Sequence, residues 1–377
     1  MINFDDNIVM KEQFLKELNI AIDKVIEEKQ QMGIDYDILE HILGNMLRVV
    51  HIRNTSQVEK IIPMKKEEML KITLDFFKSV DEEFYKKAVN LILQQHKNIK
   101  MKIYNAHKIQ DYSKKDEIEL YEYTRLGSVQ TDLGESRVNI PTQTQLNLNE
   151  RILDDDAVTL KDLYIAVHEI SHMFDLNIEA SIPDKEAILG KKTSWNKSFT
   201  RELLGESTAH AFEIMLTDYL LKNNLYSKDA ILQVENQRAN SALIDAKLVY
   251  TKLVLAKEKE KSGNITLEHV EKLMRENNMS IQGVRRLARQ IIDDPRDMLF
   301  EKRYAIAGLV APTIAKIYSE DNEKGIEIIK DYLKEAKEDN LQNVLKILGI
   351  EVSEKGINKL IQNMKNQEEK VNQVEGR

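Results

Sequence analysis

The sequence lacks cysteine altogether and is poor in glycine and proline, with 13 and 5 of these among 377 residues. Without cysteine the chain forms no disulfide and offers a metal ion no thiolate, so any metal must be held by histidine, glutamate or aspartate. Few glycines and prolines favour long helices over a turn-rich β fold. No stretch approaches the roughly 18 uncharged apolar residues of a membrane span, so we expect no membrane partner.

Positive charge is not concentrated in the chain either. The formal net charge is −8 and the two signs are mixed, whereas phosphate binding needs a concentrated basic surface, so we expect no nucleic-acid partner. The cluster Arg285-Arg286-Leu287-Ala288-Arg289 fits a solvated helix face better. The first residues lack the basic segment and apolar run of a signal peptide, and we expect a cytoplasmic protein.

Two histidines enclose a glutamate in the run His168-Glu169-Ile170-Ser171-His172. On a helix both imidazoles lie on one face, about one turn apart, so they can bind one metal ion while Glu169 stands beside them to handle protons. Many zinc peptidases build their catalytic centre from this H-E-x-x-H arrangement. The alternative is two ordinary, partly exposed histidines on an amphipathic helix.

The surrounding residues predict a helix that begins near residue 160. Thr159 followed by Asp162 resembles a capping box. An apolar stripe at helical spacing predicts the core-facing side; it consists of Leu163, Val167, Ile170 and Phe174. The two histidines and Asp175 fall on the opposite face, so Asp175 is a candidate for orienting a ligating histidine.

A catalytic zinc site needs a third protein ligand, and the run from 201 to 221 offers one. If this run is helical, it carries a polar stripe among apolar faces; the stripe consists of Glu206, His210, Glu213 and Thr217. Burying such groups is costly unless they are paired or bind a metal ion. We therefore select Glu206 as the third ligand, and His210 and Glu213 as candidates that orient the ligating histidines. The alternative is an exposed polar face.

The H-E-x-x-H motif followed by a helix of the form E-x-x-x-x-x-x-E resembles the M3 peptidases, such as thimet oligopeptidase and oligoendopeptidase F. The run Glu206-Ser-Thr-Ala-His-Ala-Phe-Glu213, continuing to Leu221, is most similar to the latter. A third stretch, Phe300-Glu-Lys-Arg-Tyr-Ala-Ile-Ala-Gly-Leu-Val-Ala-Pro312, with the helices after it, is similar in pattern to the C-terminal helices of that family. The resemblance covers roughly residues 130–360.

This resemblance implies a mainly α, zincin-like fold in which one Zn²⁺ is held by His168, His172 and Glu206, with water at a fourth position and Glu169 as general base. Tyr304 matches a tyrosine that stabilises the oxyanion in the family. The histidine that family members use upstream of that tyrosine is not matched, since an aspartate, about Asp293, stands in that region. The implied activity is that of a zinc metallopeptidase that hydrolyses oligopeptides.

The predicted organisation has three parts. They are an N-terminal helical region at 1–100, a zincin-like catalytic domain at 101–362 and a polar tail at 363–377. The catalytic domain is expected to hold a small sheet at about 118–148, zinc helices at 160–176 and 202–221, and C-terminal helices at 265–362. Alternating residues predict strands at 118–123 and 138–148, and Pro141 favours a sheet edge or a strand end. An edge strand before the metal helix would align a peptide substrate by backbone pairing.

Two other functions remain compatible with the same motifs. One is a toxin-effector-like zincin that cleaves one specific protein. The other is a catalytically silent helical interaction protein that retains the zincin fold, and the unmatched histidine favours it. Two histidines and one glutamate also accept cobalt or manganese in place of zinc.

Overall fold

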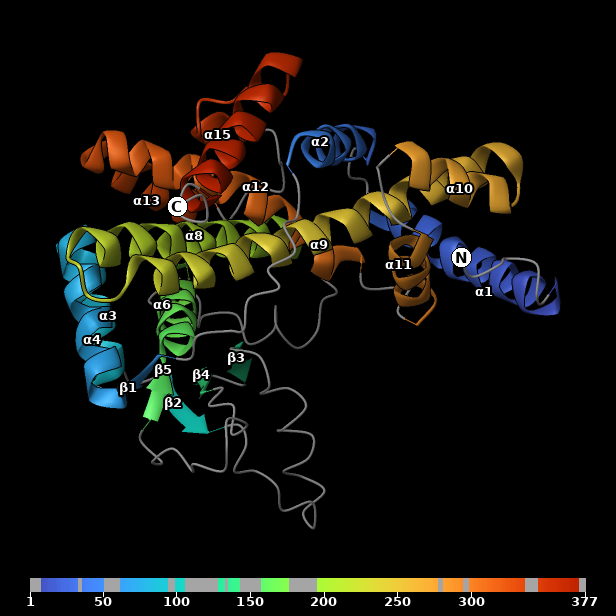
Figure 1. Ribbon diagram of the computed structural model, residues 1–377. Coiled ribbons are helices and arrows are strands. Elements are labelled where there is room, and N and C mark those ends of the chain that lie inside the picture. Colours follow the sequence, from blue (N-terminus) through green and yellow to red (C-terminus); the bar gives the residue numbers. More distant parts are fainter. Residues whose placement is uncertain are drawn as a thin grey trace, which may run out of the picture.

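The computed structural model of this chain is mainly helical, as predicted (Figure 1). It describes residues 8–32, 36–50, 62–93, 99–105, 128–132, 135–142, 157–175, 195–276, 281–293, 298–335 and 345–372. The predicted strand at 118–123 and residues 143–148 lie outside these ranges. None of the helices within them combines the length and the apolar character needed to cross a membrane.

The described part of the N-terminal region consists mainly of helices that follow apolar stripes in the sequence. They are α1 (Ile8–Met32), α2 (Tyr36–Val49), α3 (Lys66–Val80) and α4 (Glu82–Ile92). Asp81 caps α4, because its side chain accepts hydrogen bonds from the backbone N–H groups of Glu83 and Phe84 at 2.9 and 3.2 Å. The same carboxylate pairs with Lys330 at 3.2 Å, which ties the start of α4 to the C-terminal helices.

Two long helices, α8 (Trp195–Lys222) and α9 (Lys228–Ser262), cross the middle of the molecule, and α6 (Leu160–Asp175) packs against α8 below them in Figure 1. The predicted zinc helices correspond to α6 and α8. The bounds of α6 agree with the prediction to within a residue, whereas α8 begins at Trp195 and not at residue 202.

The C-terminal part is helical, as predicted. Its helices are α10 (Leu267–Glu276), α11 (Ile281–Asp293), α12 (Met298–Glu320), α13 (Asn322–Glu335) and α15 (Glu354–Asn372). Helix α15 continues to Asn372, into the stretch predicted as a polar tail at 363–377. Polar partners hold this extension in place: Gln367 donates to Glu235 at 3.2 Å, and Lys370 pairs with Asp218.

Two small sheets precede α6. In one, β1 (Pro63–Lys65) pairs antiparallel with β5 (Ala157–Thr159). In the other, β4 (Glu135–Thr142) lies between β2 (Ile99–Asn105), which is parallel to it, and β3 (Ser128–Asp132), which is antiparallel. The strand that contains Pro141 is thus central in this sheet, but Pro141 lies beyond the last residue paired with β3, Asn139, in agreement with a strand end.

Five phenylalanines form an aromatic cluster that joins the N-terminal helices to α6 and α8. The cluster consists of Phe76, Phe77, Phe84, Phe174 and Phe212, all at most 3% exposed. Phe212 contacts the other four, with ring centroids 5.5–6.4 Å apart and edge-to-face geometry in every pair, which is favourable for aromatic rings. The predicted N-terminal region therefore shares its core with the predicted catalytic domain.

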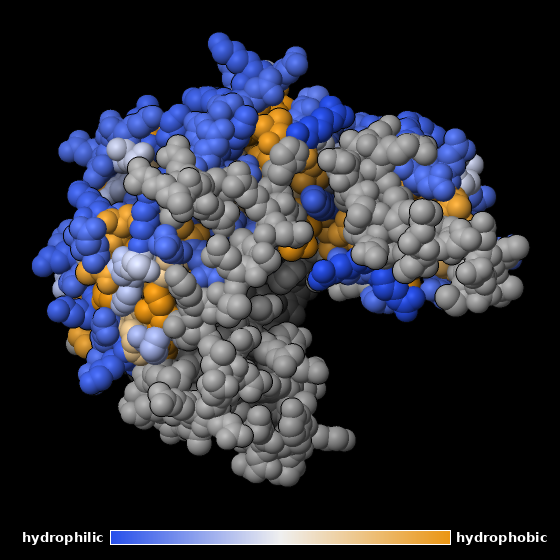
Figure 2. Space-filling model, in the orientation of Figure 1, coloured by the Kyte–Doolittle hydropathy of each residue, from blue (hydrophilic) through white to orange (hydrophobic). Residues whose placement is uncertain are grey.

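The described surface in the view of Figure 2 is mainly hydrophilic, with hydrophobic residues in separate areas. Large apolar side chains that are exposed come from different elements; they are Ile20, Val49, Leu93, Leu225 and Ile244. Single exposed apolar residues of this kind are normal on a protein surface and need no special explanation.

Candidate metal centre

The helix that carries the histidine motif begins with the predicted capping box. The Thr159 N–H donates to Asp162 Oδ2 at 2.7 Å, and the Asp162 N–H donates to Thr159 Oγ1 at 3.3 Å. Both bonds are buried and confirm the predicted start of α6. The predicted apolar stripe is buried as well, and α6 packs against α8.

Three side chains from α6 and α8 meet at one point. His168 Nε2 lies 3.0 Å from His172 Nε2 and 3.4 Å from Glu206 Oε2, and His172 Nε2 lies 3.8 Å from the same carboxylate oxygen. The structure thus brings together the residues that we selected as ligands, and this group can hold a metal ion.

The three separations fit a tetrahedral metal site. Zinc bonds of about 2.0–2.2 Å place neighbouring ligand atoms of a tetrahedron about 3.3–3.6 Å apart. An ion about 2.0–2.2 Å from all three of these atoms, which lie 3.0, 3.4 and 3.8 Å apart, would sit in or just outside the plane of their triangle, and the longer bonds leave room for a fourth ligand as in a tetrahedron. Two imidazole nitrogens and a carboxylate oxygen suit a divalent ion, but this donor set does not by itself select zinc.

Glu213 orients His168 from the other edge of the imidazole ring. Its Oε1 lies 3.1 Å from His168 Nδ1. Because an ionised carboxylate only accepts hydrogen bonds, Nδ1 carries the proton and Nε2 presents a lone pair to the point shared with His172 and Glu206.

The electrostatics keep the carboxylates of the centre charged. Burial alone would raise the pKa of Glu206, but His172, His168 and His210 lower it to about 2. Burial opposes ionisation of Glu213 in the same way, and His210 and His168 nevertheless hold its pKa far below the usual value. Burial would lower the pKa of His168, yet Glu213, Glu206 and Glu169 raise it well above its ordinary value. The carboxylates therefore attract positive charge to this point.

A largely buried arginine on α9, which we did not predict, adjoins the centre. Arg238 donates from Nε and Nη2 to the two carboxylate oxygens of Glu235, at 2.9 and 2.7 Å, and its Nε lies 3.9 Å from Glu213 Oε2. Glu235 is fully buried. In the sequence, a glutamate and an arginine three residues apart resemble an ordinary ion pair on an exposed helix face. The spacing therefore does not predict that Glu235 and Arg238 are buried.

A second group of possible ligands, His168, His210 and Glu213, lies beside the first. His210 Nδ1 is 3.0 Å from Glu213 Oε2 and 3.5 Å from Arg238 Nη1. The guanidinium never loses its charge, so a divalent ion at this place would be repelled by a fixed positive group. We therefore assign the metal to the first group, and Arg238 supplies the positive charge beside the second.

The polar stripe of α8 continues into hydrogen bonds with neighbouring helices. Thr217 Oγ1 lies 2.8 Å from the Tyr164 hydroxyl of α6 and 3.5 Å from Glu235 Oε2 of α9. Gln367 of α15 donates to the other oxygen of Glu235 at 3.2 Å. Thr217 is thus paired with neighbouring helices, whereas His210 Nε2 and Glu213 Oε2 of the same stripe are buried without a hydrogen-bond partner among the described residues.

Glu169 and Tyr304, the residues with predicted catalytic roles, lie on different elements. Glu169 is buried, 5% exposed, and is close enough to His168 to raise its pKa. The Tyr304 ring of α12 meets the His210 ring edge-on, with centroids 6.2 Å apart, so α12 brings this tyrosine to the polar stripe. Gly308 permits the close approach of α12 to α9, since a Cβ there would lie 2.5 Å from Ala242 Cβ.

Two other residues that we noted in the sequence add no contact to the centre. Asp175 is the last residue of α6, and its side chain lies outside the described residues. Asp293, at the position of the unmatched family histidine, ends α11 and pairs with Arg289 at 3.2 Å, with 60% of its side chain exposed. Its described contact is therefore a surface ion pair.

The buried charge at the centre is strongly negative. Besides the imidazoles, four buried carboxylates accompany one guanidinium, that of Arg238; they belong to Glu169, Glu206, Glu213 and Glu235. Carboxylates in a dry interior need compensating charge, and a divalent ion would supply it. This excess disfavours the alternative of two ordinary surface histidines, whose side chains are in fact only 13% and 17% exposed.

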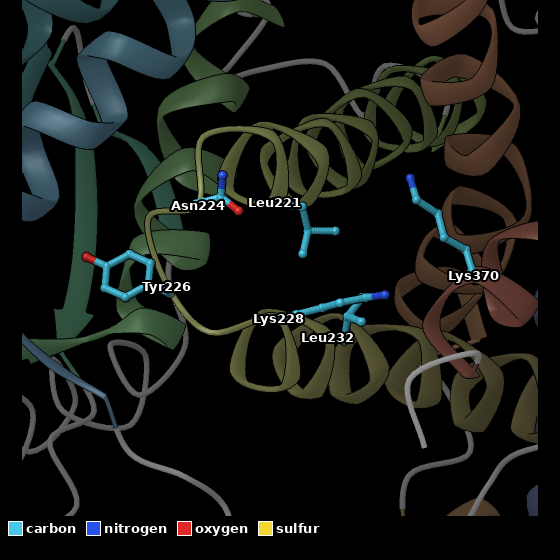
Figure 3. Close-up of a pocket in the computed structure, with 6 residues that line it drawn as sticks. All are labelled: Leu221, Asn224, Tyr226, Lys228, Leu232 and Lys370. Atoms are coloured by element: carbon cyan, nitrogen blue, oxygen red, sulfur yellow. The ribbon is translucent and has the colours of Figure 1, made fainter. Parts of the chain in front are cut away.

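A separate pocket of about 330 Å³ lies away from these ligands, at the turn between α8 and α9. Figure 3 shows its lining, from the end of α8, the turn, the start of α9 and α15: Leu221, Asn224, Tyr226, Lys228, Leu232 and Lys370. Lys370 already pairs with Asp218. The pocket contains none of the residues of the candidate centre, and we assign it no part in the chemistry.

Comparison with known proteins gives one distant structural similarity. No family model matches the chain, and no curated protein matches it. The chain aligns with a crystal structure described as a "putative peptidase from Chlamydophila abortus", with 13% sequence identity and a TM-score of 0.48. The match covers 97% of this chain and 56% of that one, so this chain spans little more than half the length of that protein.

Proposed function

We propose that this chain is a zinc-dependent metallopeptidase that resembles the M3 peptidases and hydrolyses peptide bonds in oligopeptides. The observation that carries the proposal is the convergence of His168 Nε2, His172 Nε2 and Glu206 Oε2 at separations of 3.0–3.8 Å, with Glu169 next to the first ligand. A structural metal site is normally closed by four protein ligands, whereas three ligands leave a position for water or substrate.

The protein residues have distinct roles in this proposal. His168, His172 and Glu206 hold the ion, and Glu213 fixes the tautomer of His168. When bound, zinc would supply a Lewis acid for the peptide carbonyl and acidify water. Glu169 takes the proton of the attacking water and returns it to the leaving amine nitrogen.

The Tyr304 hydroxyl donates a hydrogen bond to the oxygen of the former carbonyl group as negative charge develops on that oxygen. The edge-on contact between its ring and that of His210 supports this role, because it brings the tyrosine to the same stripe of α8 that carries Glu206.

The experiment that tests the proposal measures metal content and hydrolysis of quenched fluorescent peptides on the purified chain, beside Glu169→Gln. We expect one zinc ion per chain in both proteins and at least about 100-fold slower hydrolysis by the variant, because Glu169 acts on water and is not a ligand. A variant that lost its zinc and kept full activity per bound ion would contradict the assigned roles. A wild-type protein that bound zinc and cleaved no peptide would contradict the proposed activity.

A further inference from the structure

Glu235 and Arg238 of α9 form an ion pair inside the protein, although neither is a candidate metal ligand. Arg238 donates from Nε and Nη2 to the two oxygens of the Glu235 carboxylate, at 2.9 and 2.7 Å. The Glu235 side chain is not exposed at all, and that of Arg238 is only 8% exposed. A buried ion pair adds little net stability, and apolar residues of similar size often replace it without loss. Stability alone therefore does not explain why this pair lies inside the fold.

The guanidinium of Arg238 also faces the polar stripe of α8. Its Nε lies 3.9 Å from Glu213 Oε2, and its Nη1 lies 3.5 Å from His210 Nδ1. The other oxygen of the Glu213 carboxylate, Oε1, lies 3.1 Å from Nδ1 of the candidate ligand His168. The Glu213 carboxylate thus lies between the guanidinium and a metal ligand, so a change at Arg238 reaches the ligand through Glu213.

The Glu213 carboxylate depends on the charges around it. Its Oε2 is buried and has no hydrogen-bond partner among the described residues. Two basic groups adjoin this oxygen, His210 Nδ1 at 3.0 Å and Arg238 Nε at 3.9 Å, and of these only the guanidinium is charged at every pH. At 3.9 Å the guanidinium makes no hydrogen bond, but opposite charges at this distance attract each other strongly in a dry interior. Arg238 therefore fixes where Oε2 lies.

The guanidinium is itself held in one place. Each oxygen of Glu235 that accepts from it also has a partner on another helix: Gln367 of α15 donates to Oε1 at 3.2 Å, and Thr217 Oγ1 of α8 lies 3.5 Å from Oε2. A long side chain such as that of arginine has many rotamers, and a bidentate ion pair selects one of them. Arg238 is thus ordered independently of Glu213, as a positioning group must be.

We propose that Glu235 and Arg238 position the metal ligand His168. Glu235 fixes the guanidinium, the guanidinium fixes the Glu213 carboxylate, and that carboxylate sets the orientation in which the His168 imidazole presents Nε2 to the ion. Neither Glu235 nor Arg238 touches the ion or the substrate, so both are positioning residues. The inference rests on the proposed metal centre and extends that centre by one layer of side chains, onto α9.

The test compares the pair with a neutral replacement. Arg238→Met alone would leave Glu235 buried without its partner and so risks unfolding. The double variant Glu235→Gln/Arg238→Met removes both charges, which leaves the net charge of the centre unchanged, and its glutamine can still bond with Gln367 and Thr217. We expect this variant to fold and to bind zinc about 5- to 30-fold more weakly than wild type in chelator competition, near the lower end of the range for groups that orient a metal ligand.

Cobalt provides a measurement that a purely structural role would not change. The same donor set accepts Co²⁺, whose visible absorption depends on the geometry of its ligands. In the double variant we expect these bands to differ in position and intensity from those of wild type, because His168 is less well oriented. Arg238→Lys keeps the charge but not the fork of donors, and its spectrum should lie between the two. Leu243→Ala, at a buried apolar position of α9, is the control, which should lower stability without changing the cobalt spectrum.

A double-mutant cycle shows whether the effect passes through Glu213. Glu213→Gln removes the charge that Arg238 attracts, so adding Glu235→Gln/Arg238→Met to it should weaken zinc binding by less than about twofold more. The separate losses would instead multiply if the pair acted on the ion by another route.

Two results would overturn the inference. One is a folded double variant whose zinc affinity and cobalt spectrum match those of wild type, since the pair would then serve packing alone. The other is a triple variant whose loss of zinc affinity equals the product of the separate losses. A wild-type protein that bound neither zinc nor cobalt would contradict the proposed metal centre instead.

Discussion

Helices α6 and α8 each have an apolar face and a polar face. A comparison of the two faces distinguishes residues that stabilise the fold from residues that we assign to the chemistry. One side carries the aromatic cluster, where Phe174 and Phe212 pack on phenylalanines of the N-terminal helices α3 and α4. The other carries the ligands, where buried like charges face one another. Phe212 and Glu213 are consecutive residues on α8, so a single turn of helix stabilises the fold on one side and orients a ligand on the other.

The largest effect on stability should come from the aromatic side. Phe212→Ala removes a ring that contacts four others, and we expect the free energy of unfolding to fall by about 3–5 kcal/mol in urea titrations. The protein that remains folded should still bind one zinc ion. Phe212→Leu, which keeps most of the volume, should lose less. Loss of zinc from folded Phe212→Ala would show that the two faces are not separable.

On the polar side, the largest effect should be on turnover. Tyr304→Phe removes a donor that acts mainly in the transition state, and we expect kcat to fall by roughly 10²-fold with little change in KM. Steady-state kinetics on a quenched peptide measure this. The alternative is a tyrosine that only packs between helices, in which case the variant would show altered stability and nearly normal turnover.

A smaller effect should appear in metal affinity. Glu213→Gln keeps an oxygen that can accept the hydrogen bond from His168 Nδ1 but removes the negative charge, and we expect zinc to bind about 10- to 100-fold more weakly in chelator competition. The change in unfolding free energy should be well below that of Phe212→Ala. Glu327→Gln, at an exposed position of α13, is the control. Unchanged zinc affinity would remove Glu213 from the centre.

The smallest effect should be on the free energy of unfolding, through an exposed ion pair at the start of α4, the helix that carries Phe84 of the aromatic cluster. Hydrogen bonds with Lys87 and then Lys330 lower the pKa of Glu83 from 4.5 to about 2. Since the folded-state value is the lower one, these pairs stabilise the fold above pH 4.5, and the stabilisation is lost as the pH falls towards 2. Glu83→Gln should therefore be less stable than wild type at pH 7, by at most about 1 kcal/mol because the pairs are exposed, and the difference should narrow at pH 3. A difference that widened at low pH would contradict this account.

The sequence predicts the three candidate metal ligands better than it predicts the buried residues around them. His168 and His172 are close in the chain, and the capping box of Thr159 and Asp162 sets the helix that presents them, so local rules suffice. Glu206 could be selected because a carboxylate on an otherwise apolar helix needs a partner.

The residues that the sequence does not predict depend on tertiary packing. Arg238 and Glu235 become buried through the packing of other helices, among them α8 and α15, on α9. The same cause explains the extension of α15 beyond residue 362, where polar residues that look like a solvated tail find partners on α8 and α9. The pairing of β2 with β4 also links distant segments, and no local pattern specifies it.

Helix α9 spans 35 residues, which corresponds to about 52 Å of unbroken helix. Near its start, Glu235 and Arg238 lie beside the candidate centre, and near its end, Lys257 and Lys259 pair with Glu40 of α2 and Asp23 of α1. A substitution that bends the middle of α9 should therefore displace the two ends of the helix relative to each other. Over evolutionary time, positions on α1 and α2 should therefore covary with positions around the ligands, although the two groups lie near opposite ends of α9.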